Sequence, residues 1–236
     1  MRLAYEDRFS ELEPLLAHVE KPSRYIDHEW GALAKPDAPF RVCLIYPDVY
    51  EVGLPNQGLA ILYSVLNRTE GVGCERSYVP WVDMADAMRE AGVPLLSLEG
   101  AAPVASFDLV GFHIPHELAA TNYLEALDLA RIPILARDRS EDDPIVVAGG
   151  PSVYNPEPLS AFFDAFLVGE GEHSIAEVAL RIRELREAGA PRAEILRELA
   201  HVSGTYVPSL YRVASDEPCT RWGYTVPAAE IGRAHV

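Results

Sequence analysis

Short apolar runs alternate with stretches of helical spacing along most of this chain, and this alternation constrains the fold more than any other feature. The runs are rich in β-branched residues and read as buried strands at 41–47, 74–80, 107–114, 144–150 and 164–171, with 93–98 as a further short strand or extended segment. Between them, apolar residues recur at i, i+3, i+4 and i+7: Leu59, Leu62, Tyr63 and Leu66; Trp81, Met84, Ala85 and Met88; Ala120, Tyr123, Leu124 and Leu127; Ile175, Val178, Ala179 and Ile182. The pattern predicts an α/β fold with a doubly wound, mostly parallel sheet and helices on both faces.

Charge and composition exclude several classes of protein. The 236 residues include 36 acidic and 20 basic side chains, so the formal net charge is −16. This excess disfavours binding to nucleic acid, because phosphates need a basic surface. No uncharged apolar run reaches the roughly 18 to 20 residues that span a bilayer, and the first residues mix charged with apolar side chains, unlike a signal peptide. We therefore expect a cytoplasmic protein without a membrane partner.

The loops that follow the predicted strands are the candidate site, because ligands of such sheets bind beyond the carboxyl ends of the strands. The first loop, 47–58, is longer than the usual connection. Asn56 and Gln57 offer polar contacts there, while Gly53 and Gly58 allow a ligand to approach the main chain. The alternative is that Asn56 only caps the next helix and Gly53 only forms a turn. The loop contains neither GxGxxG nor GK[ST], so it is neither a dinucleotide fingerprint nor a P-loop.

Two further loops carry a histidine and paired glycines. His113 lies near a strand end, where an imidazole can ligate a metal or move a proton, although a hydrogen-bonded structural role is the commoner one. No carboxylate lies near it at the spacing of a zinc enzyme. Gly149 and Gly150, followed by Pro151, fit a planar ligand across the sheet edge or serve the turn alone.

The last of these loops places carboxylates at the start of a helix. Glu170 lies between Gly169 and Gly171, and Glu172 follows. These carboxylates would accept hydrogen bonds from ribose or amide groups of a ligand, or only interact favourably with the helix dipole.

We assign no catalytic residue and no metal ligand in this chain. The nucleophile motif GxSxG is absent, and neither Cys43 nor Cys74 has neighbours in the sequence that would activate its thiol. The three cysteines of the chain have no pair at metal-ligand spacing, which excludes a disulfide scaffold and a zinc ribbon.

Taken together, the motifs resemble the N-terminal domain of cobalamin-binding-type radical SAM proteins, in a bacterial branch of uncharacterised members. The resemblance covers about residues 20 to 213 and rests most on GGP, NPEPL, FFDAF and VGEGE between residues 149 and 172. Other segments that carry it are RVCLIYPDVYEVGLPNQGLAILYSVLN, ERSYVPWVDM and FDLVGFHIPHELAATNYLEALDLARIPILA, with KPSRYIDHEW before them and GTYVPSLYRV after them.

This resemblance implies a flavodoxin/Rossmann-like domain that holds cobalamin at the carboxyl edge of its sheet. Loops 47–58, 111–116, 149–155 and 169–172 would then face the corrin. In such proteins a following barrel domain binds a [4Fe–4S] cluster through CxxxCxxC and cleaves S-adenosylmethionine to a radical, and cobalamin, where bound, often relays a methyl group.

Two motifs of such proteins are missing from this chain. DxHxxG, whose histidine ligates cobalt in methionine-synthase-like domains, is absent, so cobalamin would need another lower ligand or none. CxxxCxxC is absent as well, so the cluster and S-adenosylmethionine would belong to a radical SAM barrel domain outside this fragment, which would be the partner of the present domain. The substrate is not identified.

The C-terminal residues indicate that the last part of the chain is not native sequence. The last residues, EIGRAHV, match one reading frame of a common sequencing adapter, so we expect a truncated chain with a non-native tail; the alternative is a natural extension. The expected parts are a helical or irregular arm at 1–39, the cobalamin-binding-like domain at 40–190, a small helix and bridge at 191–213, and the tail at 214–236.

Two alternatives to a cobalamin-binding domain remain open. One is a vestigial docking or lid module that binds no cofactor. The other is an independent nucleotide-binding oxidoreductase, which the missing glycine fingerprint disfavours.

Overall fold

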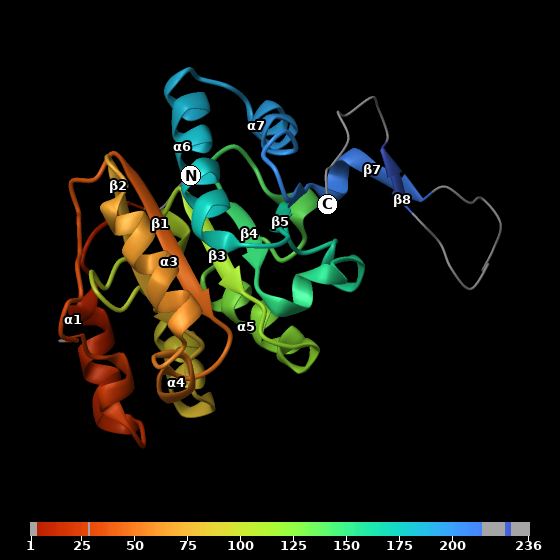
Figure 1. Ribbon diagram of the computed structural model, residues 1–236. Coiled ribbons are helices and arrows are strands. Elements are labelled where there is room, and N and C mark those ends of the chain that lie inside the picture. Colours follow the sequence, from red (N-terminus) through yellow and green to blue (C-terminus); the bar gives the residue numbers. More distant parts are fainter. Residues whose placement is uncertain (1–3, 28, 214–224, 228–236) are drawn as a thin grey trace.

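A six-stranded sheet forms the centre of the structure, a computed structural model that describes residues 4–27, 29–213 and 225–227 (Figure 1). The strand order is β2-β1-β3-β4-β5-β6, in which β1 to β5 are parallel and β6 is antiparallel to β5. The order 2-1-3-4-5 is that of a flavodoxin-like, doubly wound sheet. The strands are β1 (Phe40–Tyr46), β2 (Val72–Tyr78), β3 (Leu109–His113), β4 (Ile145–Gly149), β5 (Ala165–Leu167) and β6 (Thr205–Tyr206).

Helices cover both faces of the sheet, as the sequence predicts. On one face, α3 (Gln57–Arg68), α6 (Gly171–Glu187) and α7 (Arg192–Leu199) share an apolar core with alternate strand residues such as Val42 and Leu44. On the other face, α4 (Val82–Ala91) and α5 (Ala120–Leu129) share a second core with Cys43 and Ile45. This alternation follows from the period of two in a strand and makes the sheet the middle of three layers.

Residues 93–98, expected as a short strand or an extended segment, are not a strand of the sheet and fit the second expectation. This segment runs past the outer edge of β2, where the Leu98 N–H donates to the carbonyl of Arg76 at 2.7 Å. The N–H of Arg76, which lies on the same edge of β2, donates to the Glu99 carboxylate at 2.6 Å. The Glu99 carboxylate thus accepts a main-chain hydrogen bond that a further strand would otherwise accept at this edge. The sixth strand is instead β6, which lies within the segment predicted as a bridge.

The N-terminal arm wraps around the β2 side of the sheet. Its helical segments are α1 (Phe9–Leu12) and the 3₁₀ helices η1 (Glu13–His18) and η2 (Pro22–Tyr25). Leu12 and Val19 are buried in the core beside α4, and the Tyr5 hydroxyl donates to Glu75 on β2. Farther along, the Tyr63 hydroxyl of α3 accepts a hydrogen bond from the Leu33 N–H at 2.6 Å. The arm therefore contacts both helical layers.

A buried charge network holds together the amino edge of the sheet. Asp164, just before β5, accepts hydrogen bonds from Arg139 at 3.0 Å, from Arg192 at 2.6 Å and from the Val146 N–H at 2.7 Å. The side chains of Asp164 and Arg139 are 1% and 0% exposed. The arginines also donate to main-chain carbonyls, including that of Phe162 for Arg139 and that of Pro144 for Arg192. The network joins the segments before β4 and β5 to the start of α7.

Beyond the main sheet, β7 (Tyr211–Val213) pairs with β8 (Thr225–Pro227) in an antiparallel ribbon that stands away from the helical layers (Figure 1). The rest of the predicted tail lies outside the described residues. None of the helices that the structure describes has the length and apolar character that a membrane span needs.

Candidate functional site

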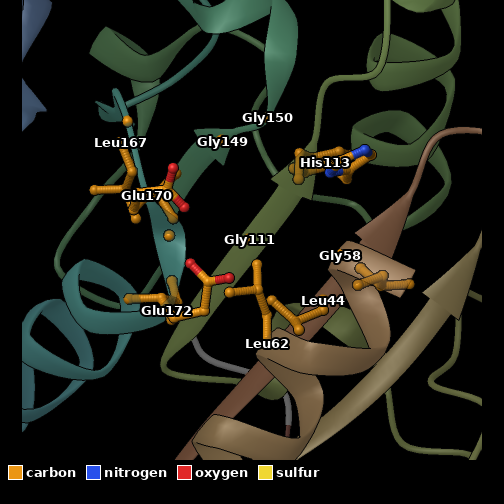
Figure 2. A pocket seen from close by; sticks show the side chains of 16 residues that line it. Leu44, Gly58, Leu62, Gly111, His113, Gly149, Gly150, Leu167, Glu170 and Glu172 are labelled. Carbon is orange, nitrogen blue, oxygen red and sulfur yellow. The ribbon is translucent and has the colours of Figure 1, made fainter. Parts of the chain in front are cut away.

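A pocket of about 200 Å³ opens at the carboxyl edge of the sheet, between α3 and α6 (Figure 2). The chain leaves β1 toward β2 on one side and returns to β3 on the other, and the two connecting helices, α3 and α4, cover opposite faces. This change of direction leaves a crevice at the end of β1, which is where doubly wound sheets bind ligands. The sixteen lining residues come from four neighbouring strands, two helices and the loops after β4 and β5. They are Leu44, Gly58, Leu59, Leu62, Gly111, Phe112, His113, Val147, Gly149, Gly150, Leu167, Gly169, Glu170, Gly171, Glu172 and Ile175.

The floor of the pocket is apolar and is hollowed by a glycine inside a strand. Leu44, Val147 and Leu167 line it from β1, β4 and β5. Between Leu44 and Val147, Gly111 of β3 has no side chain, and a Cβ there would meet a Leu44 methyl group at 2.9 Å. A glycine within a strand often marks such a close approach. Because Gly111 carries no Cβ, Leu44 can occupy the floor and a hollow remains above it.

The paired glycines after β4 have different roles. Gly150 has φ +121°, and a Cβ on it would lie 2.8 Å from the Ile114 carbonyl oxygen, so the main-chain geometry itself requires glycine. Gly149 has no such constraint, since the nearest atoms to its Cβ position belong to Leu167 at 3.8 Å or more. Gly150 therefore serves the turn, and Gly149 keeps the pocket open.

Two carboxylates border the pocket at the start of α6. Glu170 precedes the helix, Glu172 lies in its first turn, and neither carboxylate has a hydrogen bond or an ion pair with another described residue. Their carboxylates lie on the α6 side of the pocket, across from His113 and Gly58 (Figure 2). No lysine or arginine is among the lining residues. The positive end of the α6 dipole is nearby and partly offsets this negative charge.

His113 is a neutral aromatic wall of the pocket. Its imidazole stacks on the Tyr46 ring, with 5.4 Å between ring centroids and 18° between the planes. Burial lowers the pKa of His113, so the ring is uncharged at pH 7. The described residues contain no cluster of three or more histidine, cysteine or acidic side chains that would hold a metal ion.

Most residues proposed from the sequence meet in this pocket, and three do not. Those that line it are Gly58, His113, Gly149, Gly150, Gly169, Glu170 and Gly171. Asn56 is the cap of α3, since its Oδ1 accepts a hydrogen bond from the Leu59 N–H at 2.8 Å. Gln57 and Pro151 are exposed and are not among the lining residues.

Gly53 serves packing and not a ligand. It ends α2 (Tyr50–Gly53) and is buried, and a Cβ there would lie 2.6 Å from the Tyr78 ring. The long first loop therefore folds into a helical turn against β2, and only its last residue, Gly58, reaches the pocket.

Sequence reasoning missed most of the apolar lining. Leu62 and Ile175 appeared only as core positions of helices, and Leu167 only as part of a strand. A signal was present at Gly111, because a glycine inside a β-branched run indicates either a bulge or a close approach. No comparable signal distinguishes the ends of α3 and α6 that border a cavity from the parts that fill the core.

The buried thiols offer no alternative reactive centre. Cys43 and Cys74 are fully buried in β1 and β2, and burial raises the pKa of each thiol well above its usual value. Both thiols therefore stay protonated at neutral pH and are poor nucleophiles.

A larger cavity of about 560 Å³ lies at the opposite edge of the sheet, next to the Arg139–Asp164–Arg192 network. Its buried guanidinium groups already donate to Asp164 and to main-chain carbonyls. The pocket at the carboxyl edge, in contrast, combines an apolar floor with unpaired carboxylates and with glycines whose main chain a ligand can approach. We therefore take it as the candidate site.

Comparison with known proteins shows the family of the chain. The profile of the family described as "Radical SAM proteins, N-terminal" matches residues 58–208, more than half of the chain. The match begins at Gly58 and includes every lining residue except Leu44. No curated protein and no solved structure matches the chain. The chain belongs to the family of N-terminal domains of radical SAM proteins.

Proposed function

We propose that this domain holds a cobalamin-type cofactor at the carboxyl edge of its sheet, next to a radical SAM barrel domain. The observation that carries the proposal is the pocket at the end of β1, where an apolar floor is bordered by main chain free of side chains at Gly58, Gly149 and Gly171. A flat macrocycle needs such an edge, because side chains there would hold it away from the main chain.

The size of the pocket decides which part of the cofactor it fits. At about 200 Å³ it is smaller than the roughly 300–1,000 Å³ of a site that encloses a drug-sized ligand. The pocket fits one substituent of a large cofactor, and the macrocycle would rest on the glycine edge outside it. The carboxylates of Glu170 and Glu172 would accept hydrogen bonds from amide groups of the cofactor.

The chain's own residues would bind and orient the group and exclude water from its buried part. When bound, cobalamin supplies a cobalt centre that can carry a methyl group. We assign no axial ligand, because the chain lacks DxHxxG and His113 packs flat against Tyr46. The [4Fe–4S] cluster and S-adenosylmethionine are proposed for the barrel domain, since the cysteines here do not form CxxxCxxC.

Gel filtration with hydroxocobalamin tests the proposal. The chain should coelute with the corrin absorbance and shift its visible band. Gly149→Val should abolish coelution, because it places a branched side chain in the pocket at a position without backbone strain. The matched control is Ala161→Val, at an exposed site on the other edge, which should behave like the unmodified chain.

The limited volume of the pocket favours a second candidate, a docking module that binds no cofactor. It predicts no coelution of any variant. The remaining alternative is a nucleotide-binding oxidoreductase, which thermal unfolding with FMN, NAD and S-adenosylmethionine tests. Stabilisation by FMN or NAD alone would favour that alternative and contradict the cobalamin proposal.

A further inference from the structure

We infer that Glu170 and Glu172 make the pocket selective for groups that are neutral or cationic and donate hydrogen bonds, and that they exclude phosphate and carboxylate groups. The inference deepens the proposed function, since it concerns the same pocket, but it applies to the pocket whatever ligand fills it. It rests on the carboxylates, on the other polar groups of the pocket and on the two helix starts that border it.

The first step is the charge balance of the lining. Two carboxylates border the pocket, no lysine or arginine is among the described residues that line it, and burial keeps His113 neutral. Neither carboxylate has a partner among the described residues. The apolar floor strengthens the field of half-buried Glu172 more than that of exposed Glu170, because Coulomb interactions are less screened beside low-dielectric walls than in open water. An anion that enters would face two like charges, which the α6 dipole offsets only in part.

The second step concerns the helix starts, which in doubly wound folds often bind phosphate through free N–H groups. At the start of α3, the Leu59 N–H donates to Asn56 Oδ1, an oxygen of the chain itself. At the start of α6, Glu170 and Glu172 place negative charge where a phosphate would otherwise lie. Neither start therefore presents the arrangement that attracts an external anion.

The third step gives the ligand class. Apart from the neutral imidazole of His113, the polar side chains that line the pocket are carboxylates, which only accept hydrogen bonds when ionised. A complementary ligand group donates, as amides, amidines and amines do, and has an apolar part for the floor of Leu44, Val147 and Leu167. Flavin mononucleotide and nicotinamide dinucleotides carry phosphates and do not meet this description.

Three probes of nearly the same size test the inference on the full chain. Benzamidine is cationic, benzamide is neutral and donates, and benzoate is anionic. Saturation-transfer NMR and calorimetry should show binding of benzamidine and benzamide, with benzoate at least about tenfold weaker because of like-charge repulsion. Gly149→Val should remove binding of the first two, which places them in this pocket.

The double variant Glu170→Gln, Glu172→Gln should abolish the discrimination against benzoate. The matched control is Glu177→Gln, an exposed carboxylate on the same helix that does not line the pocket, and it should keep the discrimination. Equal binding of benzoate and benzamide, no binding of any probe, or unchanged ratios in the double variant would overturn the inference. Failure to bind hydroxocobalamin with intact probe selectivity would overturn the proposed function alone.

Discussion

Buried, fully paired charges lie at the amino edge of the sheet, whereas unpaired carboxylates lie at its carboxyl edge. Asp164 is bonded by Arg139, Arg192 and a main-chain N–H, and its side chain is almost completely buried. Glu170 and Glu172 line a pocket, and their carboxylates have no partner among the described residues. Charges at the amino edge therefore stabilise the fold, whereas the carboxylates at the carboxyl edge are available to a ligand.

The largest effect should come from breaking the amino-edge network. Asp164→Asn leaves two buried guanidinium groups without their counter-charge, and we expect it to lower the free energy of unfolding by about 3–5 kcal/mol. Urea unfolding followed by circular dichroism measures this. Asp138→Asn, an exposed carboxylate on the same edge, is the control and should change little. A loss below about 1 kcal/mol for Asp164→Asn would show that the network does not hold this edge.

The second-largest effect on stability should come from Glu99, a buried carboxylate at the outer edge of β2. Burial raises the pKa of Glu99 to about 7, against the lowering effect of Arg76 at 2.6 Å. An acid whose folded pKa lies above its unfolded one stabilises the fold when protonated. That contribution is complete below the unfolded pKa of about 4.5 and disappears as the pH rises through about 7.

Substitution of Glu99 should therefore change how the stability of the chain depends on pH. Unfolding free energy should fall between pH 5 and pH 7.5 by a component of up to about 3 kcal/mol that Glu99→Gln removes. Urea titrations of both proteins at the two pH values measure the component as a difference. The same pH dependence in Glu99→Gln as in the unmodified chain would assign it to other groups.

At the carboxyl edge, substitution of Gly150 should affect stability, whereas substitution of Gly149 should affect the pocket. Gly150→Ala should lower stability by about 1–3 kcal/mol, because φ is positive and the Cβ would contact the Ile114 carbonyl. Gly149→Ala should leave stability nearly unchanged while it narrows the pocket. Thermal unfolding and probe binding of the two variants measure the contrast. Equal melting temperatures would contradict the distinction between a turn glycine and a pocket glycine.

The smallest effect on stability should come from the carboxylates themselves. Glu170→Gln with Glu172→Gln should change the unfolding free energy by no more than about 0.5 kcal/mol, because no described partner loses a bond. The same urea titration measures it. A loss comparable with that of Asp164→Asn would mean that both edges use charge to stabilise the fold.

Sequence periodicity predicted the layers of this fold and the strands that lie inside the sheet. Residues such as Val146 and Val147 form apolar runs because both faces of the sheet are covered, and that is visible without a structure. The edges were harder to predict. Residues 93–98 have the composition of a strand, yet the edge of β2 is covered by one main-chain bond and the Glu99 carboxylate. Thr205–Tyr206 is too short to produce any periodic signal.

The site was predictable where it depends on main chain at strand ends and not where it depends on packing. Gly149 ends β4 and Glu170 comes shortly after β5, so the topology alone brings them to one edge. Asn56 has a side chain suited to a ligand or a cap, and only the bond to the Leu59 N–H decides for the cap. The contribution of Leu62 depends on how α3 and α6 pack over Gly111, which local sequence does not encode.

The covering of β2 has a consequence for assembly. An exposed strand edge can recruit a strand from another chain, which leads to swapping or aggregation. Here the loop at Leu98 and Glu99 occupies donors and acceptors of β2, and β6 at the opposite side has only two residues. The sheet therefore offers little template for growth by strand addition, and contacts with a neighbouring domain would form through its side chains and loops.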